Sequence, residues 1–416
     1  MNNSTNHSFT SRFLRNIFFV LIYFTGAFIL LMILSQVTKN EPFFYENSLL
    51  NWDANQYYRI VHEGYNGYRV AFFPFFPFLW KVLGCGIYAM TFFNALLFII
   101  SCAILTTVFN FSAKELFLML SFPSLIFMFL PYTEALFFFS SMVVLIGMKK
   151  NWNWVVFVGM LLASCTRPVV YVFIPIIVLI LLIRNDKHSI LQKLGFYILP
   201  ILLGLILVIY LQYTNTHDWF AFFHSQKAGW NNYIRLPKLH LTSWGGDDIA
   251  RLDGTAFLVG IMATVAIGYS FVESKRTGKS ELINQEAILF SVLYLAGISW
   301  LILFTRGGSL FSLNRFVFAT PFFFVAISCL LKKTWEAREY VLIFIGINAF
   351  WLLFGSYVHI QEVLKYFVLS IYMIFFLFIS HRNKYIALGA YLICLIGNIT
   401  LQVYCYQYFL NGGWIG

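Results

Sequence analysis

The chain has 416 residues, of which 60% are hydrophobic, 20% aromatic and 11% charged, and its mean hydropathy is +0.77. Because soluble domains carry about a quarter charged residues, this composition excludes a water-soluble globule, and it also excludes disordered, collagen-like and coiled-coil chains. A β-barrel is excluded because its strands alternate apolar and polar residues, whereas the apolar runs here are nearly unbroken. The net charge of +11 comes from short basic clusters between apolar runs. This pattern indicates membrane orientation and argues against a nucleic-acid partner.

The apolar runs predict an all-α integral membrane protein, with residues 1–416 forming one polytopic domain. A transmembrane helix needs about 20 apolar residues to cross the hydrocarbon core. The runs at 116–130 and 153–166 are short for full spans, so we expect about eleven to thirteen transmembrane helices. The first run has no small-residue cleavage site after it and is expected to be retained. The predicted helices cover 16–37, 87–110, 116–130, 132–148, 153–166, 168–184, 194–213, 255–272, 285–305, 316–331, 340–357, 364–380 and 385–406.

The loops between these runs differ in charge, and this difference predicts the orientation. With the N-terminus in the cytoplasm, the short basic clusters all fall on the cytoplasmic side, as the positive-inside rule requires. They include Lys149–Lys150, Lys275–Arg276 and Lys332–Lys333. Two long segments, 38–86 and 214–254, then form the first and second outer loops.

The first outer loop contains a predicted interfacial helix that begins at Asp53. Tyr57, Ile60 and Val61 follow at helical spacing on one face, which is typical of a helix lying in the membrane surface. In residues 71–80, two prolines are expected to interrupt regular helix and leave an aromatic segment suited to line a groove for a lipid tail.

Asp53 has two compatible interpretations. As an N-cap it would pair with Gln56, three residues later, in an imitation of a capping box. As a carboxylate at the boundary between water and lipid, it would lie against apolar surroundings that strengthen a general base.

Four other charged residues, Glu134, Arg167, Arg306 and Arg315, lie at the outer ends of predicted helices. Charged groups near membrane depth are costly and are therefore candidates for a functional site. Arginine offers a phosphate bidentate donors and keeps its charge when buried. The alternatives are snorkelling of the arginines to the interface and helix-dipole stabilisation of Glu134. Because these groups gather at one face, and no inverted repeat of interrupted helices is evident, an enzyme is favoured over a transporter.

The second outer loop is rich in acidic, histidine and tryptophan residues. A divalent metal site is one interpretation, but the spacing matches no ligand pattern. Its tryptophans, Trp219, Trp230 and Trp244, suit either stacking on a sugar ring or resting on the membrane surface, and the sequence leaves both open. The residues behind the metal interpretation are His217, Asp218, His224, His240, Asp247, Asp248 and Asp253.

Three ordered motifs carry a resemblance to a known family. They are W-D-A with A-F-F-P-F-F-P (Trp52–Pro77), P-Y-T-E-A (Pro131–Ala135) and T-R (Thr166–Arg167). The chain resembles the family of the second mannosyltransferase of glycosylphosphatidylinositol-anchor synthesis and its bacterial relatives, which are GT-C glycosyltransferases. The resemblance is strongest over residues 51–84 and 120–175.

The resemblance implies a multispanning enzyme that uses a polyprenyl-phosphate sugar as donor and an acidic residue of the first outer loop. It implies inverting transfer of a hexose, mannose by family, to a hydroxyl of a lipid, glycan or protein acceptor. The charge of the loops predicts that this takes place on the periplasmic or extracellular face. Because no retention signal is evident, a bacterial inner membrane is favoured over the endoplasmic reticulum. Asp53 would be the general base with Glu134 beside it. No cofactor is expected. A lipid or polysaccharide transporter and a non-catalytic subunit of a membrane assembly remain the alternatives. The expected phosphate ligands are Arg167, Arg315 and Arg306, and the expected substrate-binding residues are Trp52, Gln56, Tyr57, Tyr132 and Thr133.

Overall fold

The computed structural model describes residues 3–37, 45–184, 190–277, 280–355 and 360–416. Within these ranges the chain forms helices and no β-strand, and a single isolated bridge joins Thr242 to Ser309. The predicted all-α class is therefore confirmed.

The helices follow one another with short connections. In chain order they are α1 (Asn3–Val37), α2 (Glu46–Leu49), α3 (Asp53–Glu63), η1 (Gly67–Ala71), α4 (Phe75–Leu83), α5 (Ile87–Val108), α6 (Ala113–Leu120), η2 (Pro123–Phe129), α7 (Glu134–Lys150), α8 (Asn153–Thr166), η3 (Pro168–Val172), α9 (Phe173–Arg184), α10 (Ile190–Lys193), η5 (Leu194–Ile198), α11 (Leu199–Thr216), α12 (Ala221–Trp230), α13 (Asp247–Thr277), α14 (Glu281–Asn284), α15 (Glu286–Thr305), α16 (Leu313–Phe318), α17 (Pro321–Lys332), α18 (Ala337–Trp351), η6 (Leu352–Phe354), α19 (Ile360–Phe378) and α20 (Lys384–Leu410).

Eight helices of the described part are long and apolar enough to cross a membrane. They are Phe9–Gln36, Ile87–Val108, Ile190–Thr216, Asp247–Thr277, Glu286–Thr305, Ala337–Phe354, Ile360–Phe378 and Lys384–Leu410. Helices η2 and α7 meet at 101° and form a broken span or a re-entrant loop, which would make nine. Three more apolar helices, Asn153–Thr166, Pro168–Arg184 and Pro321–Lys332, are shorter. The chain is a multispanning membrane protein, and the number of spans above nine stays a prediction.

Two predicted helices are wrong because each is interrupted at a proline. The run 116–130 divides into α6 and η2, with Pro123 at the first position of η2. The run 316–331 divides into α16 and α17, with Pro321 at the first position of α17. Proline has no backbone N–H and clashes with the preceding turn, so it starts a helix more easily than it continues one.

The irregular segment predicted after Pro74 is also wrong. Pro74 is the N-cap of α4 and Pro77 lies in its first turn, where a missing N–H removes no intrahelical bond. Phe76 and Trp80 of this helix are buried at 0% and 1% exposure. These aromatic side chains therefore fill the core and do not line an open groove.

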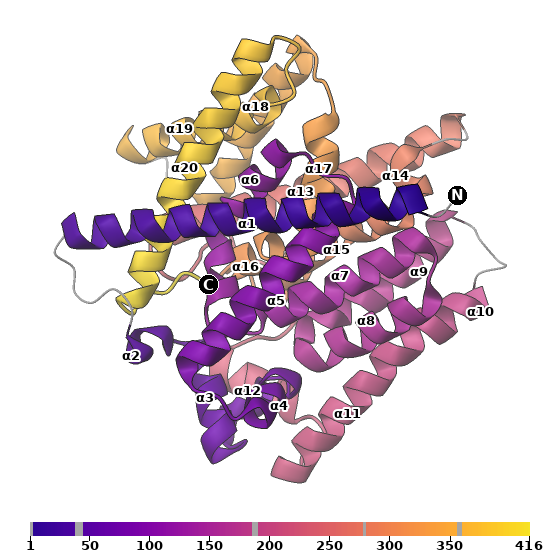
Figure 1. Ribbon diagram of the computed structural model, residues 1–416, viewed down its shortest axis with the longest axis vertical. Helices are drawn as coiled ribbons and strands as arrows, with labels where there is room; N and C mark the ends of the chain where they lie inside the picture. The colour runs from indigo at the N-terminus through magenta and orange to yellow at the C-terminus, as the bar shows by residue number, and fades with distance from the viewer. Residues whose placement is uncertain (1–2, 38–44, 185–189, 278–279, 356–359) are drawn as a thin grey trace.

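The helices lie in separate groups in Figure 1. Helices α18, α19 and α20 lie together at the top, and α3, α4 and α12 lie together at the bottom. Helix α1 crosses the front and packs on α5, while α7, α8 and α9 lie to the right of the centre. Helix α16, beside which the C-terminus lies, is enclosed by these groups.

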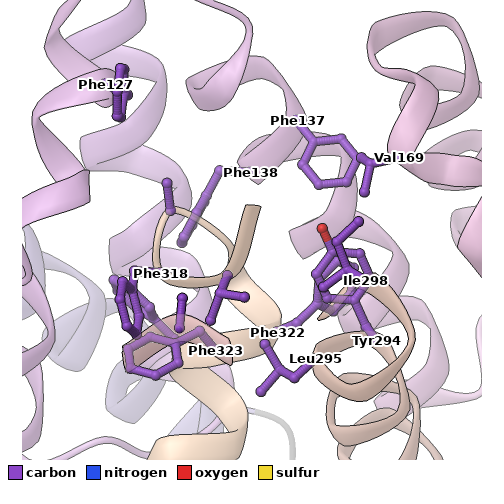
Figure 2. Close-up of a cluster of buried hydrophobic side chains, with 14 of the residues drawn as sticks. Phe127, Phe137, Phe138, Val169, Tyr294, Leu295, Ile298, Phe318, Phe322 and Phe323 are labelled. Carbon is purple, nitrogen blue, oxygen red and sulfur yellow. The ribbon is translucent and has the colours of Figure 1, made fainter. Parts of the chain in front are cut away.

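Aromatic packing fixes α16 and α17 in the core, as Figure 2 shows. The Phe322 ring lies 4.2 Å from Tyr294 of α15 and 5.7 Å from Phe173 of α9, measured between centroids. Phe318 and Phe323 are 5.0 Å apart. Because α16 is only six residues long, it depends on contacts such as that between Phe318 and Phe323 for its position.

Helices α7 and α8 approach closely through glycines. A Cβ at Gly159 would lie 2.8 Å from the Val144 nitrogen and 3.0 Å from the Ser140 oxygen, both of them backbone atoms that cannot move aside. A Cβ at Gly147 would lie 2.8 Å from the Val156 nitrogen. These contacts hold the C-terminal half of α7 against the N-terminal half of α8.

Gly159→Ala should lower the free energy of unfolding by about 1–3 kcal/mol, because the added methyl overpacks a backbone contact. Gly389→Ala in α20 is the matched control, since no atom lies within 4 Å of the position that its Cβ would take. It should leave stability unchanged or slightly raised. Thermal unfolding in lipid nanodiscs measures both, and equal melting temperatures would contradict the close α7–α8 contact.

Candidate functional site

Asp53 is the first residue of α3 and forms an ion pair, not a helix cap. Its Oδ2 accepts a hydrogen bond from Arg315 Nη2 at 2.6 Å, and its side chain is 17% exposed. The N-cap position belongs to Trp52, which makes no side-chain capping bond. The capping-box interpretation with Gln56 is therefore wrong, and Asp53 is directed toward α16.

Arg315 lies between two carboxylates. Its Nε is 2.9 Å from Glu134 Oε1, its Nη2 bonds Asp53, and its Nη1 donates to the Gly416 carbonyl at 2.9 Å. Burial alone would lower the pKa of Arg315, but the charges of Glu134 and Asp53 more than offset it and raise that pKa above its ordinary value. The guanidinium therefore stays charged while it holds two acidic groups from separate helices.

Glu134 begins α7 at the bend after η2 and is fully buried. Its Oε1 lies 2.8 Å from Arg167 Nη1 as well as near Arg315, and Arg167 is 4% exposed. The helix dipole contributes at this position, but two cations now explain the buried charge better than the dipole alone. Among the described residues, Glu134 Oε2 has no hydrogen-bond partner. This oxygen is enclosed in the protein, where the charges of Arg167 and Arg315 balance the carboxylate.

Three guanidiniums surround the ring of Phe316. The central guanidinium carbon (Cζ) lies 4.7 Å from the ring centroid in Arg167, 5.6 Å in Arg315 and 5.8 Å in Arg306. Arg306 also stacks on Phe311 at 3.5 Å and donates to the Phe311 carbonyl. These contacts favour placement inside the protein over snorkelling to an interface.

Arg306 differs from the other two arginines in its charge partners. It is 9% exposed, and in the described part of the chain no carboxylate lies within ion-pair distance of it. Burial lowers the pKa of Arg306 to about 9, and the charge of Asp253 opposes this shift. A buried cation without a paired anion is costly, so this position favours an external anion.

The predicted substrate-binding residues divide into a buried group and a surface group. Tyr57 and Thr133 are buried and joined by a hydrogen bond of 3.4 Å. Tyr132 is buried and donates to the Asn51 carbonyl at 3.2 Å. These three support the walls of the site, because their polar atoms bond to neighbouring elements.

Trp52 and Gln56 lie closer to the surface. Trp52 is 38% exposed and its indole nitrogen donates to the carbonyls of Gly412 and Gly413, each at 3.2 Å. Its backbone φ is +57°, a conformation that costs a non-glycine residue about 1–3 kcal/mol and is concentrated at functional sites. Gln56 Oε1 has no hydrogen-bond partner among the residues described.

Asp253 is a residue for which the sequence indicated only a metal-ligand role. It is fully buried in α13, where its carboxylate accepts hydrogen bonds from the Asn314 backbone N–H at 2.8 Å, from Asn314 Nδ2 at 2.7 Å and from the Ser243 hydroxyl. Asn314 also bonds Ser124 and the Ile415 carbonyl. This network holds the start of α16, and with it Arg315. An aspartate just before a long apolar run was the signal that could have identified it.

The residues that suggested a metal site in the second outer loop do not come together as one cluster in the described part of the structure. Asp218 Oδ2 pairs with His224 Nδ1 at 2.6 Å near the surface, while Asp253 belongs to the buried network. No three His, Cys, Asp or Glu side chains come together as a metal site within the described ranges.

Comparison of the chain with protein-family models, with curated proteins and with solved structures gives no match. The three sequence motifs nevertheless meet in space. Asp53 of the first motif and Glu134 of the second share Arg315, and Glu134 pairs with Arg167 of the third.

Glu134→Gln should lower the free energy of unfolding by about 3–5 kcal/mol, because it leaves Arg167 and Arg315 buried beside one carboxylate fewer. Lys365→Gln is the control. It breaks the pair with Glu362 at a half-exposed position and should cost at most about 1 kcal/mol. Thermal unfolding of the two variants in detergent should separate them clearly, and equal shifts would show that Glu134 does not balance the two arginines.

Proposed function

We propose that the chain is a membrane glycosyltransferase that moves a hexose from a polyprenyl-phosphate donor to a hydroxyl acceptor. The observation that supports this best is the group of two carboxylates and three arginines collected around Phe316. In this group one carboxylate is partly exposed, and one buried guanidinium has no ion pair with any residue that the structure describes. Transfer from a sugar phosphate requires a base and a cation in such an arrangement.

Asp53 acts as the general base. Its Oδ2 is held by Arg315, so Oδ1 takes the proton of the acceptor hydroxyl. The acceptor oxygen bonds to the sugar carbon as the bond between that carbon and the phosphate oxygen breaks, and the phosphate leaves with the electron pair. One in-line displacement inverts the sugar carbon. Base assistance contributes about 10²- to 10⁴-fold.

Arg306 binds the donor phosphate. The phosphate supplies the anion that this guanidinium lacks, and a planar guanidinium can contact two phosphate oxygens at once. Arg167 and Arg315 lie on the same Phe316 ring and add positive potential, although each is already paired with a carboxylate. Glu134 orients Asp53 through the Arg315 guanidinium that the two carboxylates share.

The charged groups of the bundle support transfer better than transport. Glu286, at the start of α15, pairs with Arg184 and Lys193, whereas Arg306 follows the end of the same helix. A helix of 20 residues separates the two groups by about 30 Å. A transport pathway for a charged substrate would require charged groups between them, and α15 carries none after Glu286.

Three parts of the proposal come from the sequence. The motif resemblance indicates mannose as the sugar, and the charge of the loops indicates the periplasmic or extracellular face. A bacterial inner membrane is the third part. The proposal includes them on that basis. A lipid, glycan or protein can present the acceptor hydroxyl.

Asp53→Asn should reduce transfer from polyprenyl-phosphate mannose or glucose at least about 100-fold, because the amide cannot accept the proton. Labelled sugar released in proteoliposomes is the measurement, with melting temperature as the check on folding. Asp218→Asn, a change at a surface carboxylate paired with His224, is the matched control and should keep full activity. Normal turnover by the Asp53 variant, or no turnover of either donor by folded wild type, would contradict the proposal.

A further inference from the structure

The residues that follow α20 run back into the charged site. Helix α20 ends at Leu410, and Gly412, with a φ of +85°, turns the chain toward the core. Beyond this turn Ile415 is 2% exposed and Gly416 is buried. Residues 411–416 form the C-terminal segment, whose end lies beside α16 in Figure 1.

One end of the C-terminal segment holds the start of α3. The carbonyls of Gly412 and Gly413 each accept a hydrogen bond from Trp52 Nε1 at 3.2 Å. Asn51 Nδ2 donates to a carbonyl in the last turn of α20 at 2.8 Å. Asn51 and Trp52 are the two residues that precede Asp53. These bonds therefore fix the backbone from which the Asp53 side chain extends.

The other end of the C-terminal segment holds Arg315. The Gly416 carbonyl accepts a hydrogen bond from Arg315 Nη1, and the Ile415 carbonyl accepts one from Asn314 Nδ2, both at 2.9 Å. The other nitrogens of the Arg315 guanidinium contact the two carboxylates of the site. A hydrogen bond from a charged donor is about twice as strong as a neutral one. The segment thus supplies one of the three partners that orient this guanidinium.

The middle of the C-terminal segment is fixed as well. The centroid of the Trp414 ring lies 4.9 Å from that of Trp52 and 5.3 Å from that of Trp244. Gly245 has a φ of +94°, and a Cβ at this position would lie 2.6 Å from the Trp414 carbonyl, so only glycine allows the two chains to approach this closely. The segment is therefore held along its length between the two members of the ion pair.

An ion pair alone would leave the geometry of Asp53 and Arg315 loosely defined. Asp53 is the first residue of α3, and Arg315 lies in α16, which has only six residues. The Asp53 side chain is 17% exposed, so water competes with Arg315 for its hydrogen bonds. The four backbone carbonyls of the C-terminal segment, two at each end, limit this freedom.

We propose that the C-terminal segment is a positioning element of the transfer reaction, which keeps Asp53 Oδ2 on Arg315 so that Oδ1 faces the acceptor. The inference deepens the proposed function and rests on it. The segment acts through Trp52 and Arg315, and in the described part of the chain no hydrogen bond joins it to Arg306. A displacement of about 1 Å at a catalytic group can lower the rate on the order of 100-fold. The segment should therefore affect turnover more than donor binding.

Gly413→Ala should displace the segment, because the added methyl would overlap the Tyr408 ring. In proteoliposomes with polyprenyl-phosphate mannose, kcat should fall about tenfold or more, while KM for the donor stays within about twofold of wild type. Tyr408→Ala removes the obstructing ring, so the double variant should recover most of kcat. Gly389→Ala, also in α20, is the matched control and should keep full activity, since its Cβ would meet no atom within 4 Å.

Trp52→Phe tests the segment from its other contact without creating a clash. The variant keeps an aromatic ring and loses the N–H that bonds two carbonyls of the segment. It should also lower kcat and leave KM for the donor unchanged. A loss of kcat that follows the melting temperature in both variants, and that Tyr408→Ala does not restore in the Gly413 variant, would overturn the positioning role.

An electron cryomicroscopy structure of Gly413→Ala in nanodiscs without donor separates this inference from the proposed function. We expect Asp53 and Arg315 to lie beyond hydrogen-bond distance in the variant and to stay in contact in wild type. That result would support the positioning of the ion pair even if wild type transferred neither mannose nor glucose. An intact contact beside a displaced segment, or normal kcat in both Gly413→Ala and Trp52→Phe, would overturn the inference and leave the proposed function standing.

Discussion

The structure depends on one buried guanidinium. Arg315 joins Asp53 of α3 to Glu134 of α7, and Glu134 extends the chain of charges to Arg167 at the end of α8. A charge removed from water is tolerated only when an opposite charge and hydrogen bonds replace the lost solvation. Each of these groups is therefore held in place by the others, and the site forms only when four separate segments have packed.

Several helices around this charged cluster are interrupted close to the site. Prolines begin η2 and α17, and the bend between η2 and α7 directs Glu134 into the bundle. The six residues of α16 are too few to be stable alone, so Asp253 and the aromatic contacts of Phe318 and Phe322 fix its position. The helices are interrupted here, and the position of the Arg315 side chain is fixed as a result.

The sequence predicted the class of fold, most helices and the charged residues of the site, because long apolar runs and isolated charges are strong signals in a membrane protein. It could not predict that Asp53 pairs with Arg315, since these residues are far apart in the chain and both suit other roles. It gave Asp253 only a metal-ligand role and missed Asn314, because the function of both residues lies in contacts between helices. The breaks at Pro123 and Pro321 were missed because hydropathy continues through them.

The central claim is that Arg306, a buried cation with no carboxylate partner among the described residues, receives the phosphate of the donor beside Asp53. An electron cryomicroscopy structure of the protein in nanodiscs with polyprenyl-phosphate mannose tests it directly. We expect phosphate density within hydrogen-bond distance of the Arg306 guanidinium, with the sugar between it and Asp53. Phosphate bound at the other end of α15, beside Arg184 and Lys193, would contradict this claim.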